Sequence, residues 1–229
     1  MNCCKPILAV GLVIGLASPF FFPALAPAQN TGEAGVQGSK NIRSLKEIRG
    51  EGVVRQRWDV SCGAAALSTV LTYDFKDPTQ ETAIVVWLLH RVDAKRVRDR
   101  GGFSLLDLKH FAEARGYRAE GFSGMTIEDL ALQKTSVITP IRAKGVDHFV
   151  VVKGIVEGHV VMADPAFGNM TMRVDQFQKL WKDGIVFLVH PPDERMTAKK
   201  NLSVASRIVP DQTLITRKIG VTAPSNFLY

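Results

Sequence analysis

Residues 56–67 read QRWDVSCGAAAL, and they bring a cysteine to the first position of an expected helix. From that cysteine onward, apolar side chains recur at helical spacing over residues 62–73. Asp59 or Ser61 can cap the helix, and the free N–H groups and positive dipole end of its first turn favour a thiolate at Cys62. The stretch therefore predicts a reactive thiol at a helix start.

The first 28 residues have the pattern of a secretory signal peptide. Lys5 precedes an apolar run over residues 7–22, and alanines follow at alternate positions up to Ala28. We expect residues 1–28 to be removed by a cut after Ala28, with an uncleaved membrane anchor as the alternative. The mature protein should then be soluble and exported, for example to the periplasm.

Export would decide which cysteines remain in the mature protein. Cys3 and Cys4 would leave with the signal peptide, so Cys62 would be the only thiol of the mature chain. A lone thiol cannot form an intrachain disulfide, and it is a hazard in an oxidising compartment unless it has a task. A buried structural cysteine is the alternative, and the count alone does not decide between the two.

Composition and charge indicate the class of protein and how the chain is divided into domains. Its 229 residues are 46% hydrophobic and 22% charged, which excludes global disorder. We expect a flexible leader over residues 29–51, one compact domain over residues 52–190 and a basic tail over residues 191–229. The net charge of +7 comes with no zinc-ligand spacing and no aromatic-rich strand, so no nucleic-acid partner is expected. Weak contact with anionic lipid headgroups stays open.

Helices should come first in the domain and an antiparallel sheet second, which makes it an α+β domain. Asp77 followed by Pro78, Ser104 with Asp107, and Thr126 are expected to begin helices. Later, short runs rich in β-branched residues alternate with glycines. The expected strands cover residues 137–141, 149–153, 160–163, 170–173 and 185–189, with a brief helix over residues 174–181.

Gln56 is a candidate for stabilising an oxyanion. Its side-chain amide can donate a hydrogen bond to a developing oxyanion together with the backbone N–H of Cys62. A glutamine taken alone is more often a surface residue. Gly63, next to the cysteine, is expected to let a substrate backbone come close to the sulfur.

Five histidines compete for the role of general base, and strand pairing favours His148. His148 opens an apolar strand, where a core histidine with satisfied hydrogen bonds is the usual occupant. However, Lys153 and His159 flank a short turn, and pairing them predicts that Asp164 lies directly opposite His148 on the same sheet face. The carboxylate can then accept from one imidazole nitrogen and leave the other free for the thiol proton. A one-residue slip in the turn would move the carboxylate away.

Separate blocks of the sequence resemble the bacteriocin-processing cysteine peptidases, which cut after double-glycine leaders. Besides residues 56–67, the blocks are GGFSLLDLKHFAEARGY at 101–117, DHFVVVKGI at 147–155 and ADPAFGNM at 163–170. The resemblance spans about residues 52–190. It implies a papain-like fold, with N-terminal helices packed on an antiparallel sheet. It also implies a Cys-His-Asp mechanism at Cys62, His148 and Asp164, with Gln56 in the oxyanion hole.

The sequence departs from that family in one respect. Most familiar members are the cytoplasmic N-terminal domain of an ATP-driven peptide exporter, whereas this sequence shows no phosphate-binding Gly-rich loop with Lys. ATP use is therefore not expected, and no cofactor or metal is expected either. The chain is more similar to stand-alone exported members, some of which are encoded beside functional-amyloid secretion systems.

These observations lead us to expect an exported thiol endopeptidase. Its partner should be a peptide or an exported protein, cut after a double-glycine-type site, with a peptide or amyloid export system as a further candidate partner. A non-catalytic peptide-binding module of the same fold is one alternative, although the intact set of candidate residues argues against it. A cell-wall amide hydrolase of related fold is the other.

Overall fold

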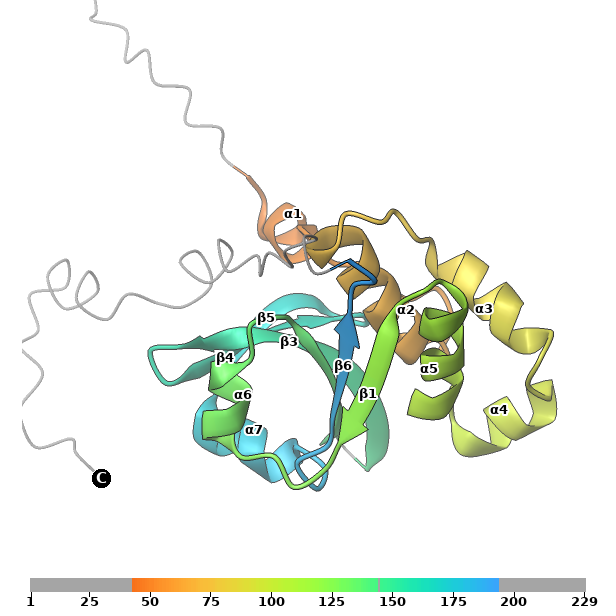
Figure 1. Ribbon diagram of the computed structural model, residues 1–229. Coiled ribbons are helices and arrows are strands. Elements are labelled where there is room, and N and C mark those ends of the chain that lie inside the picture. Colours follow the sequence, from red (N-terminus) through yellow and green to blue (C-terminus); the bar gives the residue numbers. More distant parts are fainter. Residues whose placement is uncertain (1–42, 144, 194–229) are drawn as a thin grey trace, which may run out of the picture. The chain divides into compact units, whose positions relative to one another are not determined.

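A computed structural model describes residues 43–143 and 145–193 of the chain (Figure 1). The expected signal peptide, most of the expected leader and nearly all of the expected tail lie outside the described residues. Within these two ranges no helix has both the length and the apolar character needed to cross a membrane.

One antiparallel sheet forms the centre of the domain, with the strand order β1-β6-β2-β3-β4-β5. The strands expected from the sequence are confirmed as β2 to β6, and β1 was not predicted. Its sequence, RAEGF, contains a glycine and buries little except Ala119, so it lacks the pattern of a strand. The bounds are β1 Arg118–Phe122, β2 Val137–Ala143, β3 Val146–Val156, β4 His159–Asp164, β5 Gly168–Arg173 and β6 Val186–His190.

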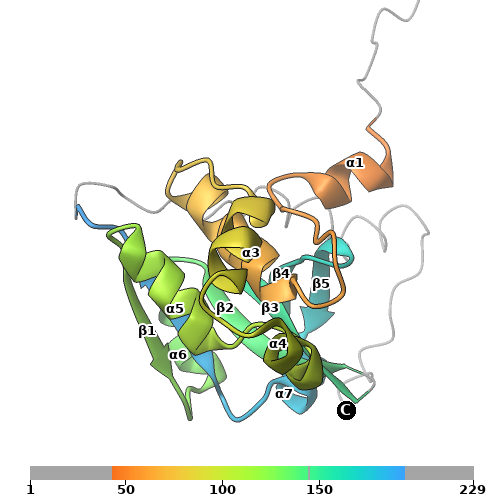
Figure 2. The ribbon, with the colours of Figure 1, turned by 90° about the vertical axis from the view of Figure 1, so that its right-hand side faces the viewer.

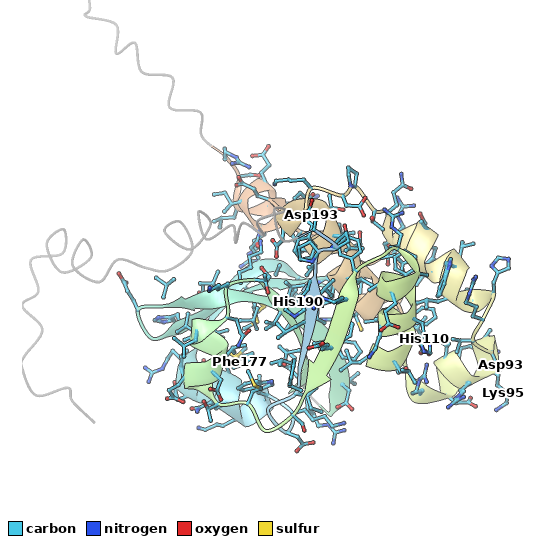
Figure 3. The ribbon with its side chains drawn as sticks, viewed as in Figure 1. Asp93, Lys95, His110, Phe177, His190 and Asp193 are labelled. Atoms are coloured by element: carbon cyan, nitrogen blue, oxygen red, sulfur yellow. The ribbon has the colours of Figure 1, made fainter. Side chains whose placement is uncertain are left out.

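The helices cover both faces of the sheet. On one face pack α2, α3 and α5, and Figure 2 looks onto this side. On the other face pack α6 and α7, and Phe177 anchors α7 there in a fully buried position (Figure 3). The bounds are α1 Leu45–Gly50, α2 Cys62–Thr69, α3 Glu81–Leu89, α4 Ala94–Arg100, α5 Leu105–Ala114, α6 Ile127–Leu132 and α7 Val174–Leu180, with a π-helical turn η1 Val70–Asp74 after α2.

Burial on both faces explains the apolar character of the central strands. In β3, Val151 belongs to the core beneath α2, whereas its neighbours Val150 and Val152 belong to the core beneath α6 and α7. Successive residues of a strand point to opposite faces, so a strand covered on both sides is apolar over most of its buried length. The α+β class expected from the sequence is confirmed.

Capping motifs in the sequence predicted two helix starts correctly and one incorrectly. Ser104 and Thr126 each form the expected capping box, with Asp107 and Asp129 respectively. The start expected at Asp77 is wrong, because α3 begins at Glu81. The Asp77 carboxylate instead accepts hydrogen bonds from Arg115, at 2.6 Å, and from the Tyr117 hydroxyl, at 3.0 Å. A carboxylate engaged in these tertiary contacts does not cap the nearby helix.

The last part of the expected flexible leader is a helix, α1, which corrects that expectation. The buried Asn169 of β5 donates from its side-chain amide to the backbone carbonyls of Ile48, Arg49 and Glu51. Its amide oxygen accepts from Lys153, whose buried ammonium also donates to the carbonyl of Gly52. The end of α1 and the residues after it are therefore fastened to the sheet by buried polar side chains.

Gly168 lets α1 approach the sheet closely. Its φ is +86°, and a Cβ atom at this position would overlap the carbonyl oxygen of Arg49. Only glycine meets both conditions without strain. Gly168 also pairs with Asp164 across the turn between β4 and β5, so α1 rests against the strand that follows this turn.

Candidate active site

Cys62 is the first residue of α2 and lies at the wall of a cleft of about 400 Å³. One wall of the cleft is residues 100–106, which run from the end of α4 into α5. The other comes from the sheet side and includes Pro140, Asp147 and Phe149. The thiol is 6% exposed, so it is buried in the domain yet borders a space that a ligand can enter.

His148 and Asp164 are joined by a hydrogen bond, as expected from the sequence. The distance from His148 Nε2 to Asp164 Oδ1 is 2.9 Å. Cys62 lies near enough to His148 to help raise the pKa of the imidazole. Because Nε2 is taken by the carboxylate, Nδ1 is the ring nitrogen left for the thiol. The structure thus brings the three side chains together in the order sulfur, imidazole, carboxylate.

The strand register behind this contact differs from the expected one. His159 pairs with Val156, not with Lys153, because the hairpin turn consists of Glu157 and Gly158 alone. Both turn residues have positive φ, which is the geometry of a tight two-residue hairpin turn. The prediction that Asp164 lies directly opposite His148 was therefore wrong.

A rigid turn holds the Asp164 carboxylate in place. Oδ1 accepts the backbone N–H groups of Ala166, at 2.6 Å, and Phe167, at 3.1 Å, in addition to the imidazole. The residue is 3% exposed. An aspartate that binds the backbone just after itself is pinned at the start of its turn, so the carboxylate presents a fixed acceptor to the histidine.

The surroundings of His148 favour its charged form. Burial acts against a charged imidazole, but the hydrogen bonds to Asp164 and Cys62, together with the negative charges of both groups, outweigh it. These interactions raise the pKa of His148 from 6.5 to about 9. The imidazole therefore carries a proton at neutral pH.

Gln56 lies in the segment before Cys62, and its backbone is tied to the turn that carries Asp164. Its N–H donates to the carbonyl of Pro165, at 2.9 Å. Its side-chain Nε2 donates to the carbonyl of Trp58, at 3.0 Å, which is its single acceptor within the described part of the chain. An amide nitrogen carries two hydrogens, so this geometry leaves one for another acceptor.

The residues on either side of Cys62 are held by contacts within the domain, and one expectation about them is corrected. Gly63 is buried, and a Cβ atom there would lie 3.1 Å from a methyl carbon of Leu108 and 3.2 Å from the ring of Phe149. Gly63 therefore serves the packing of α2 against α5 and β3, and the expectation that it gives a substrate access to the sulfur stays a prediction. Ser61 is the N-cap residue of α2, but its side chain accepts no hydrogen bond from an N–H of the helix. Its hydroxyl contacts the carboxylate of Glu81 instead.

The other four histidines have different surroundings. His110 lies exposed on α5, and His190 ends β6 (Figure 3). The rings of His90 and His159 contact backbone carbonyls close in sequence. Within residues 43–143 and 145–193 no group of His, Cys, Asp or Glu side chains could hold a metal ion.

Sequence reasoning missed Glu81, the first residue of α3. Its carboxylate is buried and binds the loop that leads into Cys62. An acidic residue in the first turn of a helix is usually interpreted as an exposed favourable charge, so no local pattern indicates this contact.

Comparison with known proteins fits this geometry. The family model described as "Peptidase C39 family" matches residues 51–194. The chain is 34% identical over 210 residues to a protein of Pseudomonas aeruginosa named "Probable functional amyloid protease FapD", covering 86% of this chain and 88% of that protein. A protein of the same name from Pseudomonas fluorescens is 34% identical over 178 residues, with 78% of this chain and 76% of that protein covered.

A solved structure supports the same fold. The peptidase domain of Streptococcus ComA, a bifunctional ABC transporter involved in quorum sensing, superimposes with a TM-score of 0.51 at 21% identity. The match covers 61% of this chain and 97% of that domain. The family model spans well over half of the sequence and includes Cys62, His148 and Asp164. The chain is therefore a cysteine peptidase with a papain-like α+β fold, and it belongs to the Peptidase C39 family.

Proposed function

We propose that this protein is an endopeptidase in which Cys62 is the nucleophile, His148 the general base and acid, and Asp164 the residue that orients the histidine. The observation that carries the proposal is the 2.9 Å hydrogen bond from His148 Nε2 to Asp164, which leaves Nδ1 for the thiol. This arrangement is the one that activates a thiol nucleophile: a base within reach of the sulfur and a third group that holds the base.

The chemistry follows from the positions of the charges. His148 holds the proton taken from Cys62, and the sulfur attacks the carbonyl carbon of the scissile peptide bond. The C–N bond then breaks as the imidazolium gives its proton to the leaving amine, which leaves a thioester on Cys62. Water, activated by the now neutral imidazole, hydrolyses the thioester and restores the thiol. Throughout, Asp164 keeps the ring in one orientation and favours its charged form.

The developing oxyanion needs donors near the sulfur. The backbone N–H of Cys62 at the start of α2 is one, and the positive end of the helix adds to its effect. The remaining amide hydrogen of Gln56 is the second. Such donors act in a site shielded from water, where a hydrogen bond to a developing charge is strongest.

The substrate is proposed to be a peptide or exported protein that is cut after a double-glycine-type site, outside the cytoplasm. Membership of the family supports the double-glycine preference. The names of the two Pseudomonas relatives support a substrate connected with functional amyloid. The pattern of residues 1–28 supports export. Cell fractionation with an antibody to the domain tests the compartment, and recovery in the cytoplasm would contradict export.

The test of the activity is a peptide series that varies the two residues before the cut, with Cys62→Ala as the control. We expect cleavage after Gly-Gly or Gly-Ala in a flexible segment, and little action on unfolded proteins of the casein type. Equal cleavage after Phe-Arg would contradict the substrate preference. Cleavage that survives in Cys62→Ala would contradict the nucleophile.

The alternative of a non-catalytic peptide-binding module makes a different prediction. Such a module binds the same peptides without cleaving them, and its thiol has no need of an activating partner. Rapid labelling of Cys62 by a small thiol reagent at neutral pH, lost in His148→Ala, supports the enzyme. Slow labelling that is the same in both proteins supports the binding module.

A further inference from the structure

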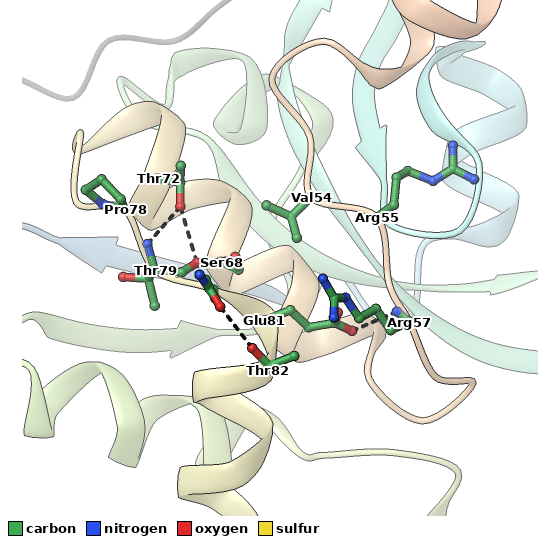
Figure 4. Close-up of a pocket in the computed structure, with 10 residues that line it drawn as sticks. Val54, Arg55, Arg57, Ser68, Thr72, Pro78, Thr79, Glu81 and Thr82 are labelled. Atoms are coloured by element: carbon green, nitrogen blue, oxygen red, sulfur yellow. Dashed lines mark hydrogen bonds between the residues drawn. The ribbon is translucent and has the colours of Figure 1, made fainter.

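Glu81 is a buried acid outside the group of residues that the reaction uses directly. It is the first residue of α3 and is 3% exposed. Its Oε1 accepts the backbone N–H of Arg57 at 3.0 Å (Figure 4) and the hydroxyl of Ser61 at 2.5 Å. Within the described residues Oε2 has no hydrogen-bond partner. Burying a carboxylate costs free energy that hydrogen bonds must offset, and in the part of the chain that the structure describes only one of its two oxygens has such partners.

Both partners of Glu81 belong to the loop that precedes the nucleophile. Arg57 directly follows Gln56, and Ser61 directly precedes Cys62. The Ser61 oxygen also accepts the N–H of Trp58, at 3.2 Å, and lies 2.8 Å from the carbonyl oxygen of Trp58. Two acceptors therefore compete for the single hydroxyl proton, and the carboxylate of Glu81, at 2.5 Å, is the stronger of the two. The carboxylate therefore fixes the loop at both of its ends. Its position at the N-terminus of α3 offsets part of the cost of burying the charge.

The conformation of Ser61 decides where the N–H of Cys62 points. Ser61 has φ −104° and ψ 9°, which lies in the sparsely populated bridge region of backbone space. The ψ angle of a residue sets the direction of the N–H of the next residue. A side chain that is fully buried and hydrogen-bonded to Glu81 holds Ser61 in this conformation. The direction of the Cys62 N–H thus depends on Glu81.

The second oxyanion donor depends on the same loop. The Gln56 side chain donates to the carbonyl of Trp58, which lies between the two points that Glu81 holds. A loop free to move would carry Trp58 away and let the Gln56 amide rotate. One carboxylate from a different helix therefore helps to hold both proposed donors, together with the hydrogen bonds between Ser61 and Trp58.

We propose that Glu81 is a positioning residue that fixes the oxyanion hole of this enzyme through Arg57 and Ser61. This inference rests on the proposed function, because it concerns the donors of that same site. Glu81 touches neither the substrate nor the sulfur, so its loss should spare the reactivity of the thiol itself. It should weaken the stabilisation of the charge that develops on the substrate carbonyl.

The test compares two reactions of Cys62. Peptide cleavage passes through an oxyanion, whereas alkylation by iodoacetamide displaces iodide at a saturated carbon and needs no oxyanion hole. Removal of one oxyanion donor lowers turnover about 10²–10³-fold, so an indirect loss in Glu81→Leu should lower kcat roughly 10–100-fold. We expect KM and the alkylation rate of this variant to stay close to those of the wild type. In Glu81→Gln the side-chain oxygen still accepts from Arg57 and Ser61, and most of kcat should return.

Matched controls separate positioning from general damage. Glu128 is an exposed acid in the first turn of α6, so Glu128→Leu should change neither reaction. If Glu81→Leu does not fold, Ser61→Ala decides the question. This variant removes one of the two bonds to the carboxylate without a large change of volume, and it should lower kcat with alkylation preserved.

Each outcome has a defined meaning. Equal loss of cleavage and alkylation in Glu81→Leu, or in Ser61→Ala where the former does not fold, would overturn the positioning role. So would full kcat in the variant, or a loss of kcat in Glu81→Gln as large as in Glu81→Leu. If the wild-type protein neither cleaves peptides nor alkylates rapidly, the proposed function itself fails, and the role of Glu81 fails with it.

Discussion

His148 and Asp164 are bonded at 2.9 Å although they lie diagonally across the β3–β4 hairpin and not opposite each other. The last pair of the ladder on this side is Val151 with Ala163, so Asp164 continues toward Val150. His148 is one further residue along the same face, a separation that an imidazole and a carboxylate can span. The two side chains can therefore meet because they lie on the same face of the hairpin, and they need not be directly paired across it.

Replacing Asp164 by asparagine should change the pH dependence of peptide cleavage. The amide keeps the size of the side chain but removes the negative charge that helps to raise the pKa of His148 to about 9. Cleavage needs the imidazolium as acid, so the alkaline limb of kcat/KM, which reports the free enzyme, should lie near pH 9 in the wild type. In Asp164→Asn we expect this limb to move to lower pH and kcat to fall. An unchanged alkaline limb would contradict the claim that the charge of Asp164 raises the pKa of His148.

The stability of the domain should also depend on His148 in a defined pH range. Its pKa is raised on folding, from 6.5 to about 9, so its stabilising contribution is complete below pH 6.5 and is lost as the pH rises through 9. Thermal unfolding of the wild type and of His148→Gln should be compared between pH 6 and 10. The difference in Tm should shrink toward the alkaline end. A difference that grows with pH would contradict the charged imidazole.

Gln56→Ala should lower turnover roughly 10²–10³-fold, the usual loss for one oxyanion donor. The backbone bond from Gln56 to Pro165 survives the substitution, so the fold should be preserved. Steady-state cleavage and the alkylation rate of Cys62 should be measured together. Wild-type turnover in this variant would leave Gln56 as a residue of the loop without a role in the reaction.

Asn169→Ala should destabilise the domain by about 2–4 kcal/mol, because it leaves buried carbonyls and the Lys153 ammonium without a shared partner. Urea unfolding measures the loss, and hydrogen exchange should show faster exchange in α1. The matched variant is Ser44→Ala, which removes only the capping box of α1 and should cost about 1 kcal/mol. Equal effects of the two substitutions would mean that Asn169 does not fasten α1 to the sheet.

Sequence reasoning succeeded where the signal is local or periodic. The boxes at Ser104 and Thr126 are complete within four residues, so the sequence alone specifies them. At the turn the register differs from the expected one by three residues, but the bulge between Val152 and Gly154 takes up one of them. The remaining shift of two residues keeps a side chain on the same face, so the contact between His148 and Asp164 was found with the wrong register. A shift of one residue would have moved it to the opposite face.

Long-range contacts explain what could not be predicted. Asp77 looks like a helix cap, but its partners lie 38 and 40 residues away in the chain. Glu81 looks like an exposed acid of a first turn, and only the packing of the loop 20 residues earlier buries it. Strand β1 has no apolar alternation because it lies at the edge of the sheet and exposes most of its side chains.

The central claim is that Cys62 forms a covalent intermediate with the part of the substrate before the cut. The most direct measurement is intact-protein mass spectrometry after rapid acid quench of the enzyme with a Gly-Gly peptide. We predict a transient mass increase equal to the N-terminal fragment minus water, located on Cys62 by digestion and absent from Cys62→Ala. Peptide cleavage without any adduct on Cys62, and undiminished in Cys62→Ala, would contradict the account.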